Sequence, residues 1–179
     1  GNAINSLREA YVKDLEPVVK AMMKKLLHKH DNITLDYSKG WENNQTLDEA
    51  LQNSLTKDLK YGYTQIGPQR ADLSINYNGT PIQEHFSQGQ QKLMIYSLKL
   101  AQGQHLQKIN QRNTILLIDD LPSELDSQKQ ACICDILSSL NTQIFITAIN
   151  TESIVPCIAK EEREMFHMEQ GKMTRTTHQ

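Results

Sequence analysis

The stretch Ile115-Leu116-Leu117-Ile118-Asp119-Asp120-Leu121-Pro122-Ser123-Glu124-Leu125-Asp126 decides the fold. Its four consecutive aliphatic residues are typical of a buried strand. A second run of this kind, Gln143-Ile144-Phe145-Ile146-Thr147, follows a helix that we expect over about residues 127–140. Two strands joined through a helix at this distance predict a parallel βαβ unit. We therefore expect an α/β fold.

Two acids follow the first of these strands. Ligands of open α/β folds bind at the carboxyl edge of the sheet, where Asp119 and Asp120 are expected to lie. Asp119 can hold Mg²⁺ there, directly or through water, while Asp120 faces the other way and can orient or deprotonate a water molecule. The alternative is that both acids only cap the strand and begin a turn.

The helix that precedes this strand begins with Phe86-Ser87-Gln88-Gly89-Gln90-Gln91. Ser87 and the backbone of Gly89 are expected at the helix N-terminus, where N–H groups and the helix dipole favour an anion. Phosphate is the natural ligand of such a site. The alternative is that Ser87 is an ordinary N-cap, which is the commoner role of a serine at this position.

The N-terminal residues have a helical pattern. Apolar residues recur every three or four positions over residues 4–30, which predicts one long helix, or two joined at Pro17. Residues 33–37 alternate like a half-buried strand, and Thr46-Leu47-Asp48-Glu49 has the form of a capping box. The face that Leu47 begins is expected to continue through Leu51, Leu55 and Leu59.

The pattern changes from helices to short strands after Tyr61. Asn78-Gly79 and Gln170-Gly171 are each expected to turn a hairpin. We predict two parts, a mainly helical appendage at residues 1–60 and an α/β portion at residues 61–179. The expected fold is thus a parallel βαβ core with a terminal hairpin, plus an N-terminal helical appendage.

The composition excludes several classes of protein. The 179 residues are 38% hydrophobic and 22% charged, with a formal net charge of -2, as in ordinary globular domains. No stretch approaches the roughly 18 apolar residues of a membrane span, and no signal-peptide layout opens the chain. We expect no membrane association and a cytoplasmic location. The three cysteines have no redox or zinc spacing and are expected to be reduced thiols.

Contact with nucleic acid would need a local basic patch, because the chain as a whole carries almost no net charge. The candidate is the run from Lys20 to His30, which contains no acid. Its lysines, which could bind phosphates in a salt-dependent manner, are Lys20, Lys24, Lys25 and Lys29. A solvated helix face is the alternative.

Taken in order, these segments resemble the ABC-type ATPases of the SMC and RecF class. Phe86–Gln90 is similar to the signature sequence, Ile115–Asp120 to the Walker B strand, and Ser123–Asp126 to the loop rich in dimer contacts that follows it. The RecF group is closer still, because Gly67–Leu73 and Gln143–Ala148 also match it in the right order. This resemblance is good over about residues 58–150 and looser before them.

The resemblance assigns roles around an ATP held between two heads. Asp119 would coordinate Mg²⁺, and Asp120 would position or activate the attacking water. The segment Thr147–Asn150 lacks the switch histidine of transporters, so the resemblance implies for Thr147 only a role in sensing the γ-phosphate. The residues expected to reach the nucleotide bound on the opposite subunit are Ser87, Gln88, Gly89 and Gln90, and those expected at the dimer seam are Ser123 and Asp126.

One motif of the class is missing from this sequence. A phosphate loop, G-x-x-x-x-G-K-[ST], supplies backbone donors and a lysine to the phosphates. No segment fits it, since Gly171-Lys172 is followed by Met173 and has no glycine five residues earlier. Together with a start at Gly1 that lacks an initiator methionine, this absence leads us to expect the C-terminal part of a longer protein, inactive as an ATPase by itself.

The resemblance implies a part in recombinational DNA repair, replication and the SOS response. The protein would bind single-stranded, double-stranded and gapped DNA, form a homodimer with ATP, and act with recombination mediator proteins. One alternative is another SMC-like or transporter-like ATPase head. The other is a non-catalytic interaction module in which Ser87 and the acids are structural caps.

Overall fold

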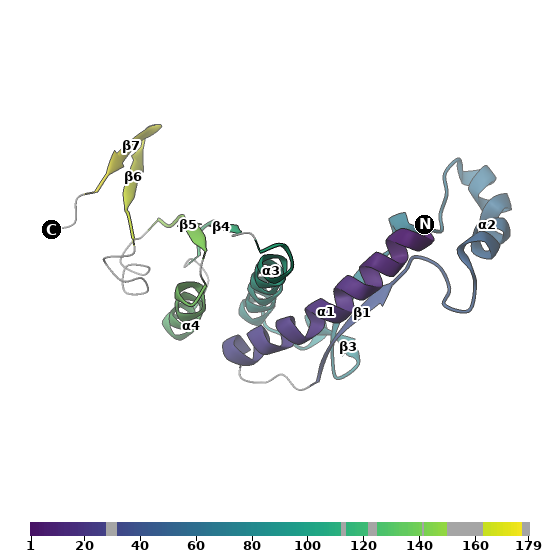
Figure 1. Ribbon diagram of the computed structural model, residues 1–179, viewed down its shortest axis with the longest axis horizontal. Helices are drawn as coiled ribbons and strands as arrows, with labels where there is room; N and C mark the ends of the chain where they lie inside the picture. Colours follow the sequence, from purple (N-terminus) through teal and green to yellow (C-terminus); the bar gives the residue numbers. More distant parts are fainter. Residues whose placement is uncertain (28–31, 112–113, 122–124, 141, 150–162, 177–179) are drawn as a thin grey trace. The chain divides into compact units, whose positions relative to one another are not determined.

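Helices and strands follow one another along most of the chain (Figure 1). The computed structural model describes residues 1–27, 32–111, 114–121, 125–140, 142–149 and 163–176. The chain divides into two units, Gly1–Ile109 and Asn110–Gln179. Within the described residues they contain one parallel and two antiparallel sheets, which confirms the mixed α/β class.

The first unit opens with helix α1 (Asn2–Leu27), which runs through Pro17 without a break. Of the two predicted alternatives, one long helix or two joined at Pro17, the structure has the first. Pro17 removes a backbone donor, but Lys13, whose carbonyl would accept that N–H, is exposed to solvent. The buried face of α1 consists of Leu15, Val19, Met22, Met23 and Leu26.

An antiparallel sheet follows, made of β1 (Ile33–Ser38), β2 (Asp72–Tyr77) and β3 (Thr80–Pro81). Asn78 and Gly79 join β2 to β3 with φ angles of 52° and 83°, as a type I′ hairpin requires, which confirms this turn. Strand β1 comes before residue 61 and β2 after it, so one sheet spans the predicted boundary. The predicted division of the chain into domains at residue 61 stays a prediction.

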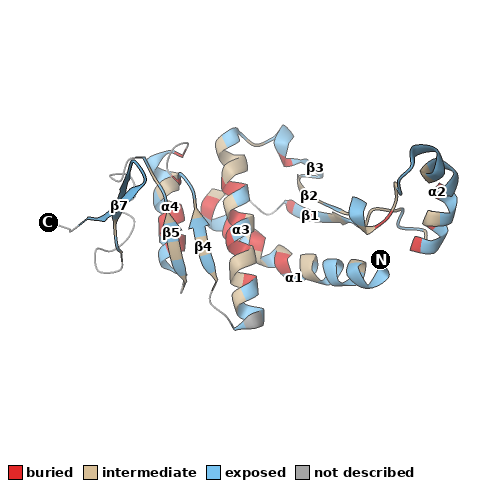
Figure 2. Cartoon of the chain, turned by 90° about the horizontal axis from the view of Figure 1, so that it is seen from above, coloured by how far each residue is buried: buried red, intermediate tan, exposed pale blue. Residues whose placement is uncertain are grey.

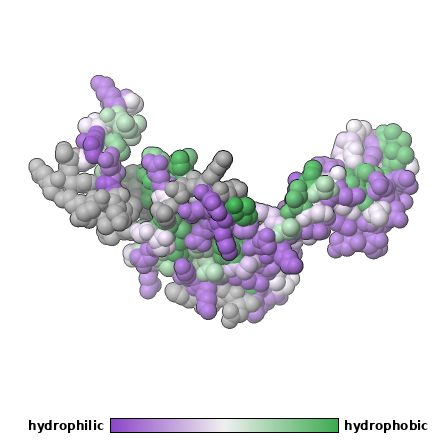
Figure 3. Space-filling view, in the orientation of Figure 1, coloured by the Kyte–Doolittle hydropathy of each residue, from purple (hydrophilic) through white to green (hydrophobic). Residues whose placement is uncertain are grey.

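Helix α2 (Leu47–Tyr61) begins with the predicted capping box, in which Thr46 and Glu49 bond reciprocally. The predicted leucine face is wrong: the buried residues are Leu47, Ala50 and Ser54, whereas Leu55 and Leu59 are 56% and 77% exposed. A helix has 3.6 residues per turn, so each step of four residues rotates the stripe by about 40° away from the buried face. Apolar surface is visible on this part of the molecule in Figure 3.

Two 3₁₀ turns, η1 (Pro68–Arg70) and η2 (Ile82–Glu84), lead toward helix α3 (Gln88–Asn110). Figure 2 shows buried residues along α3, and those with almost no exposure are Leu93, Met94, Ser97, Leu100 and Ala101. Tyr11 of α1 lies edge-on to His105 of α3, with ring centroids 5.4 Å apart. The α3 helix thus contributes to the core of the first unit.

The second unit contains the predicted βαβ element. Strands β4 (Ile115–Ile118) and β5 (Gln143–Ile146) pair in parallel, and α4 (Ser127–Ser138) lies between them in sequence. Buried apolar residues of α4 are Ile133, Cys134, Ile136 and Leu137. Cys132 and Cys134 are both thiols, and Cys157 lies outside the described residues.

The prediction that β4 and β5 are buried strands is wrong for one of their two faces, as far as the structure describes them. Ile115, Leu117 and Phe145 are 61%, 78% and 51% exposed. Side chains of a strand alternate between the two faces of a sheet. The half-buried residues occupy the other face and are Leu116, Ile118, Ile144 and Ile146.

The second unit ends in a hairpin of β6 (Phe166–Glu169) and β7 (Lys172–Arg175). Gln170 and Gly171 turn it with φ angles of 46° and 78°, which confirms the predicted turn. Gly171-Lys172 thus belongs to a hairpin and begins no helix. Among the helices of the described ranges, none is long and apolar enough to cross a lipid bilayer.

Candidate nucleotide-contact site

Asp119 and Asp120 lie at the carboxyl end of the parallel strand pair, as predicted, and Thr147 lies beside them. The Thr147 N–H donates to the Ile118 carbonyl at 2.9 Å, which extends the ladder by one residue. The Thr147 hydroxyl donates to Oδ1 of Asp119 and accepts from the Asp120 N–H at 3.0 Å. Three hydrogen bonds therefore connect Thr147 to the end of β4.

Asp120 has a left-handed backbone conformation, with φ at 50°. Aspartate and asparagine visit this region more readily than most residues that carry a side chain. The turn rotates the chain abruptly after Asp119, so that two consecutive acids do not continue the alternation of the strand. Both carboxylates are exposed, and solvent or a ligand can reach them.

Asp119 and Asp120 fit a site in which Mg²⁺ receives most of its ligands from phosphate oxygens and water. Within the described part of the chain, no group of three or more histidine, cysteine, aspartate or glutamate side chains could hold a metal ion. Mg²⁺ is usually held by one or two carboxylates, with phosphate oxygens and waters completing its octahedron. Asp119 and Asp120 can supply that protein share.

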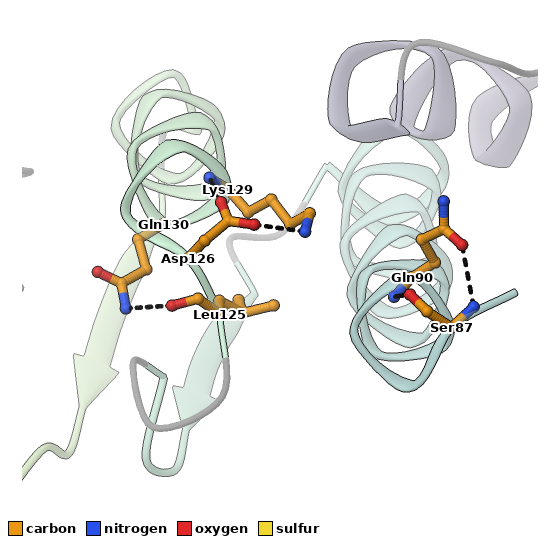
Figure 4. A network of polar contacts seen from close by, with 6 residues as sticks. All are labelled: Ser87, Gln90, Leu125, Asp126, Lys129 and Gln130. Carbon is orange, nitrogen blue, oxygen red and sulfur yellow. Dashed lines mark hydrogen bonds and ion pairs between the residues drawn. The ribbon is translucent and has the colours of Figure 1, made fainter.

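Ser87 caps helix α3, and Figure 4 shows the pair that it forms with Gln90. The Gln90 N–H donates to Oγ of Ser87 at 3.3 Å, and the Ser87 N–H donates to Oε1 of Gln90 at 2.9 Å. Ser87 and Gln90 thus form a reciprocal capping box, the motif that was predicted at Thr46. The Ser-x-x-Gln pattern of residues 87–90 is typical of it, but the box was not predicted here. A serine hydroxyl that accepts one hydrogen bond can still donate its own proton.

Among the residues that the structure describes, none gives Gly89 a steric reason to be glycine. A Cβ atom built on it would meet nothing within 4 Å. Glycine in a helix is less favourable than alanine by roughly 0.5–1 kcal/mol. The N–H groups of Gln88 and Gly89, in the first turn of α3, have no acceptor inside an α-helix. A ligand at Gly89 would therefore find open space and backbone N–H groups that can donate to it.

Asp126 caps helix α4 (Figure 4). Its Oδ1 accepts from the Lys129 N–H at 2.9 Å, and its Oδ2 forms a 2.5 Å ion pair with Lys129 Nζ. The side-chain hydrogen bond from Lys129, followed by the backbone bond, lowers the pKa of Asp126. The sequence pattern alone did not indicate Lys129 as the partner of Asp126. The dimer-seam role of Asp126 stays a prediction, and Ser123 lies outside the described residues.

Asp126→Ala is expected to loosen the first turn of α4, because the Lys129 N–H loses its acceptor. Asp126→Asn keeps a capping oxygen and should retain more protection, so it is the matched control. Hydrogen exchange of the α4 amides measures the difference. The pKa of Asp126 is lower in the folded state than in the unfolded state. The stability that its carboxylate contributes to α4 is therefore fully present above about pH 4, and it is lost as the pH falls through the folded-state pKa. Equal exchange in all three proteins at pH 7 would contradict the assignment.

The basic run is only partly described. Lys20 forms a 2.8 Å ion pair with Glu16 on α1, while Lys24 and Lys25 are exposed in the last turn of that helix. Lys29 lies outside the described residues. The buried residues of this region face the core, as in an ordinary solvated helix. A DNA contact through these lysines stays a prediction.

The fold of the chain is similar to that of solved SMC ATPase structures. A solved structure from work on the ATP-driven dimerisation and DNA-stimulated activation of SMC ATPases superimposes with a TM-score of 0.53. The match covers 97% of this chain and 89% of that one, at 13% identity. At such an identity the likeness shows the fold alone.

The particular protein that the chain resembles is RecF. The DNA replication and repair protein RecF of Pseudomonas entomophila (strain L48) is 39% identical over 174 residues, which cover 97% of this chain and 47% of the relative. A solved structure of the recombination mediator protein RecF with ATP, from the RecFOR pathway, covers 99% of this chain and 47% of its own, with a TM-score of 0.75 and 24% identity.

The chain is similar to RecF proteins over almost its whole length, which confirms the resemblance predicted from its motifs. It spans about half the length of the curated relatives it matches. No protein-family model matches the sequence.

Proposed function

We propose that the chain is the C-terminal part of a RecF-like, ATP-dependent DNA-binding protein that acts in recombinational repair, replication and the SOS response in the cytoplasm. The observation that carries this proposal is the alignment of 97% of the chain with a DNA replication and repair protein, at 39% identity. The two acids at the carboxyl edge of β4 and β5 support it, because they lie where open α/β folds bind nucleotides.

ATP and Mg²⁺ are the ligands that this site would take in the full-length protein. A RecF relative has been solved with ATP. Asp119 would hold Mg²⁺, which supplies charge neutralisation at the phosphates when bound. Asp120 would orient the attacking water and accept its proton.

The signature segment supplies the contact with a second head. Ser87 can still donate its proton, and the first-turn N–H groups of α3 can donate to phosphate oxygens. Two such heads would enclose ATP as a homodimer on single-stranded, double-stranded or gapped DNA. Recombination mediator proteins would be the partners of that assembly. Thr147 and the seam residues Ser123 and Asp126 would complete its surroundings.

ATP turnover tests this proposal. We expect the full-length protein to hydrolyse ATP and the chain of 179 residues alone to show no turnover above the buffer rate, because no phosphate loop is present in it. Phosphate release is measured for both proteins, with and without DNA. Robust hydrolysis by the chain alone would overturn the argument from the missing loop.

A non-catalytic interaction module is the second candidate. The observation that favours it is that Ser87 and Asp126 both make the capping bonds of a purely structural residue. This alternative requires the same nucleotide affinity for the chain alone and for the full-length protein. Calorimetric titration with a non-hydrolysable ATP analogue separates the two, since the ATPase proposal requires tight binding by the full-length protein only.

A further inference from the structure

We infer that Thr147 is a positioning residue, which fixes the Asp119 carboxylate and the Asp120 backbone for the divalent cation and the water of the site. This inference rests on the proposed function, because it concerns the same acids. It differs from a role in sensing phosphate, in which the Thr147 hydroxyl itself would contact the nucleotide.

The direction of the hydrogen bonds separates the two roles. A threonine hydroxyl has one proton, and in this structure Thr147 donates it to Oδ1 of Asp119. A phosphate oxygen is an acceptor, so Thr147 cannot bond to it without releasing Asp119. Ser87 differs, because its hydroxyl acts here as an acceptor and keeps a proton to donate.

The second hydrogen bond of the Thr147 hydroxyl stabilises the backbone turn at Asp120. The Asp120 N–H donates to Thr147 Oγ1 at 3.0 Å while Asp120 holds its left-handed conformation. A residue in this region is disfavoured relative to ordinary conformations, so a specific backbone hydrogen bond helps to retain it. One side chain thus constrains both acids, through the carboxylate of the first and the backbone of the second.

Residues that hydrogen-bond to metal ligands have measurable effects on metal affinity. An outer residue that orients a ligating carboxylate typically changes metal affinity by about 10- to 100-fold when it is removed. Because Asp119 and Thr147 are exposed, water can replace part of the lost bond, and we expect an effect near the lower limit. The cation affinity of the site should therefore depend on the Thr147 hydroxyl.

The experiment compares four variants of the full-length protein: Thr147→Val, Thr147→Ser, Thr142→Val and Asp119→Ala. Valine has the shape of threonine without its hydroxyl, and serine restores the hydroxyl. Thr142 is the matched control, because its hydroxyl donates to the Thr114 carbonyl and connects the same two strands at their opposite end. Mn²⁺ affinity is measured by electron paramagnetic resonance with a non-hydrolysable ATP analogue, and amide exchange is measured at Asp120.

We expect Thr147→Val to raise the Kd for Mn²⁺ by about tenfold and to speed exchange at Asp120. Thr147→Ser and Thr142→Val should keep the affinity of the unsubstituted protein. Unchanged affinity in Thr147→Val, with a clear loss in Asp119→Ala, would overturn the positioning role and leave the proposed function intact. Unchanged affinity in Asp119→Ala would instead overturn the proposed cation site itself.

A measurement on the unsubstituted protein keeps the test independent of folding in the variants. The Asp120 amide must exchange more slowly than an amide exposed to water, because Thr147 accepts its hydrogen bond. Exchange at the rate of an unstructured amide would overturn the inference without any substitution.

Discussion

Asp120→Asn in the full-length protein is expected to reduce ATP hydrolysis by about 100-fold or more, because a positioned general base contributes at least that factor. Asparagine can still orient a water molecule but accepts no proton from it. ATP binding should survive, so the variant should accumulate as an ATP-bound dimer. Phosphate release measures the first effect, and sedimentation velocity with and without ATP measures the second.

Asparagine is the informative substitution because it tolerates the left-handed backbone of Asp120, where φ is 50°. Alanine at this position would add backbone strain of roughly 1–2 kcal/mol and confuse the result. Asp48→Asn, in the exposed first turn of α2, is the matched control and should leave hydrolysis unchanged. Undiminished hydrolysis in Asp120→Asn would show that the role assigned to Asp120 is wrong.

Gly89→Asp is expected to have opposite effects on folding and on dimerisation. An acid in the first turn of α3 stabilises the helix by about 0.3–1 kcal/mol, and the site has room for a Cβ atom. A carboxylate beside bound phosphate would instead repel it at a cost of several kcal/mol. ATP-dependent dimerisation of the full-length protein should therefore weaken by about 100-fold, which corresponds to about 2.7 kcal/mol.

Two controls separate charge from size and from position. Gly89→Ala adds a methyl group without charge, and Ala3→Asp adds the same charge to the exposed first turn of α1. Thermal unfolding should show no loss of stability in any of the three proteins. If Gly89→Asp dimerises with ATP as well as Ala3→Asp does, α3 does not meet a phosphate.

The parallel strand pair and its acids could be predicted because the signals are local. A continuous aliphatic run, a helix and a second run fix the order of β4, α4 and β5, and the acids follow β4 directly. The bond from Thr147 to Asp119 joins residues 28 positions apart. Its geometry depends on how far β5 extends beside β4, which the sequence pattern leaves open.

Exposure was predicted less well than secondary structure. The leucines of α2 and the aliphatic residues of β4 are apolar at the right spacing, yet Leu59 and Leu117 are 77% and 78% exposed. Periodicity shows which side chains share a face, but whether another element covers that face depends on tertiary packing. The sequence already indicated the N-cap role of Ser87 as an alternative, and the capping role of Asp126 follows from the same short-range rules and could also have been predicted.

The exposed apolar face of β4 and β5 also affects the tendency of newly synthesised chains to aggregate. Ile115, Leu117 and Phe145 remain in contact with water after their strands have paired. Apolar strands that stay exposed are surfaces through which unassembled chains aggregate. Each of these strands has only four residues, so its edge offers few N–H and C=O groups to a neighbouring chain. The shortness of β4 and β5 therefore limits the aggregation that their apolar side chains would otherwise promote.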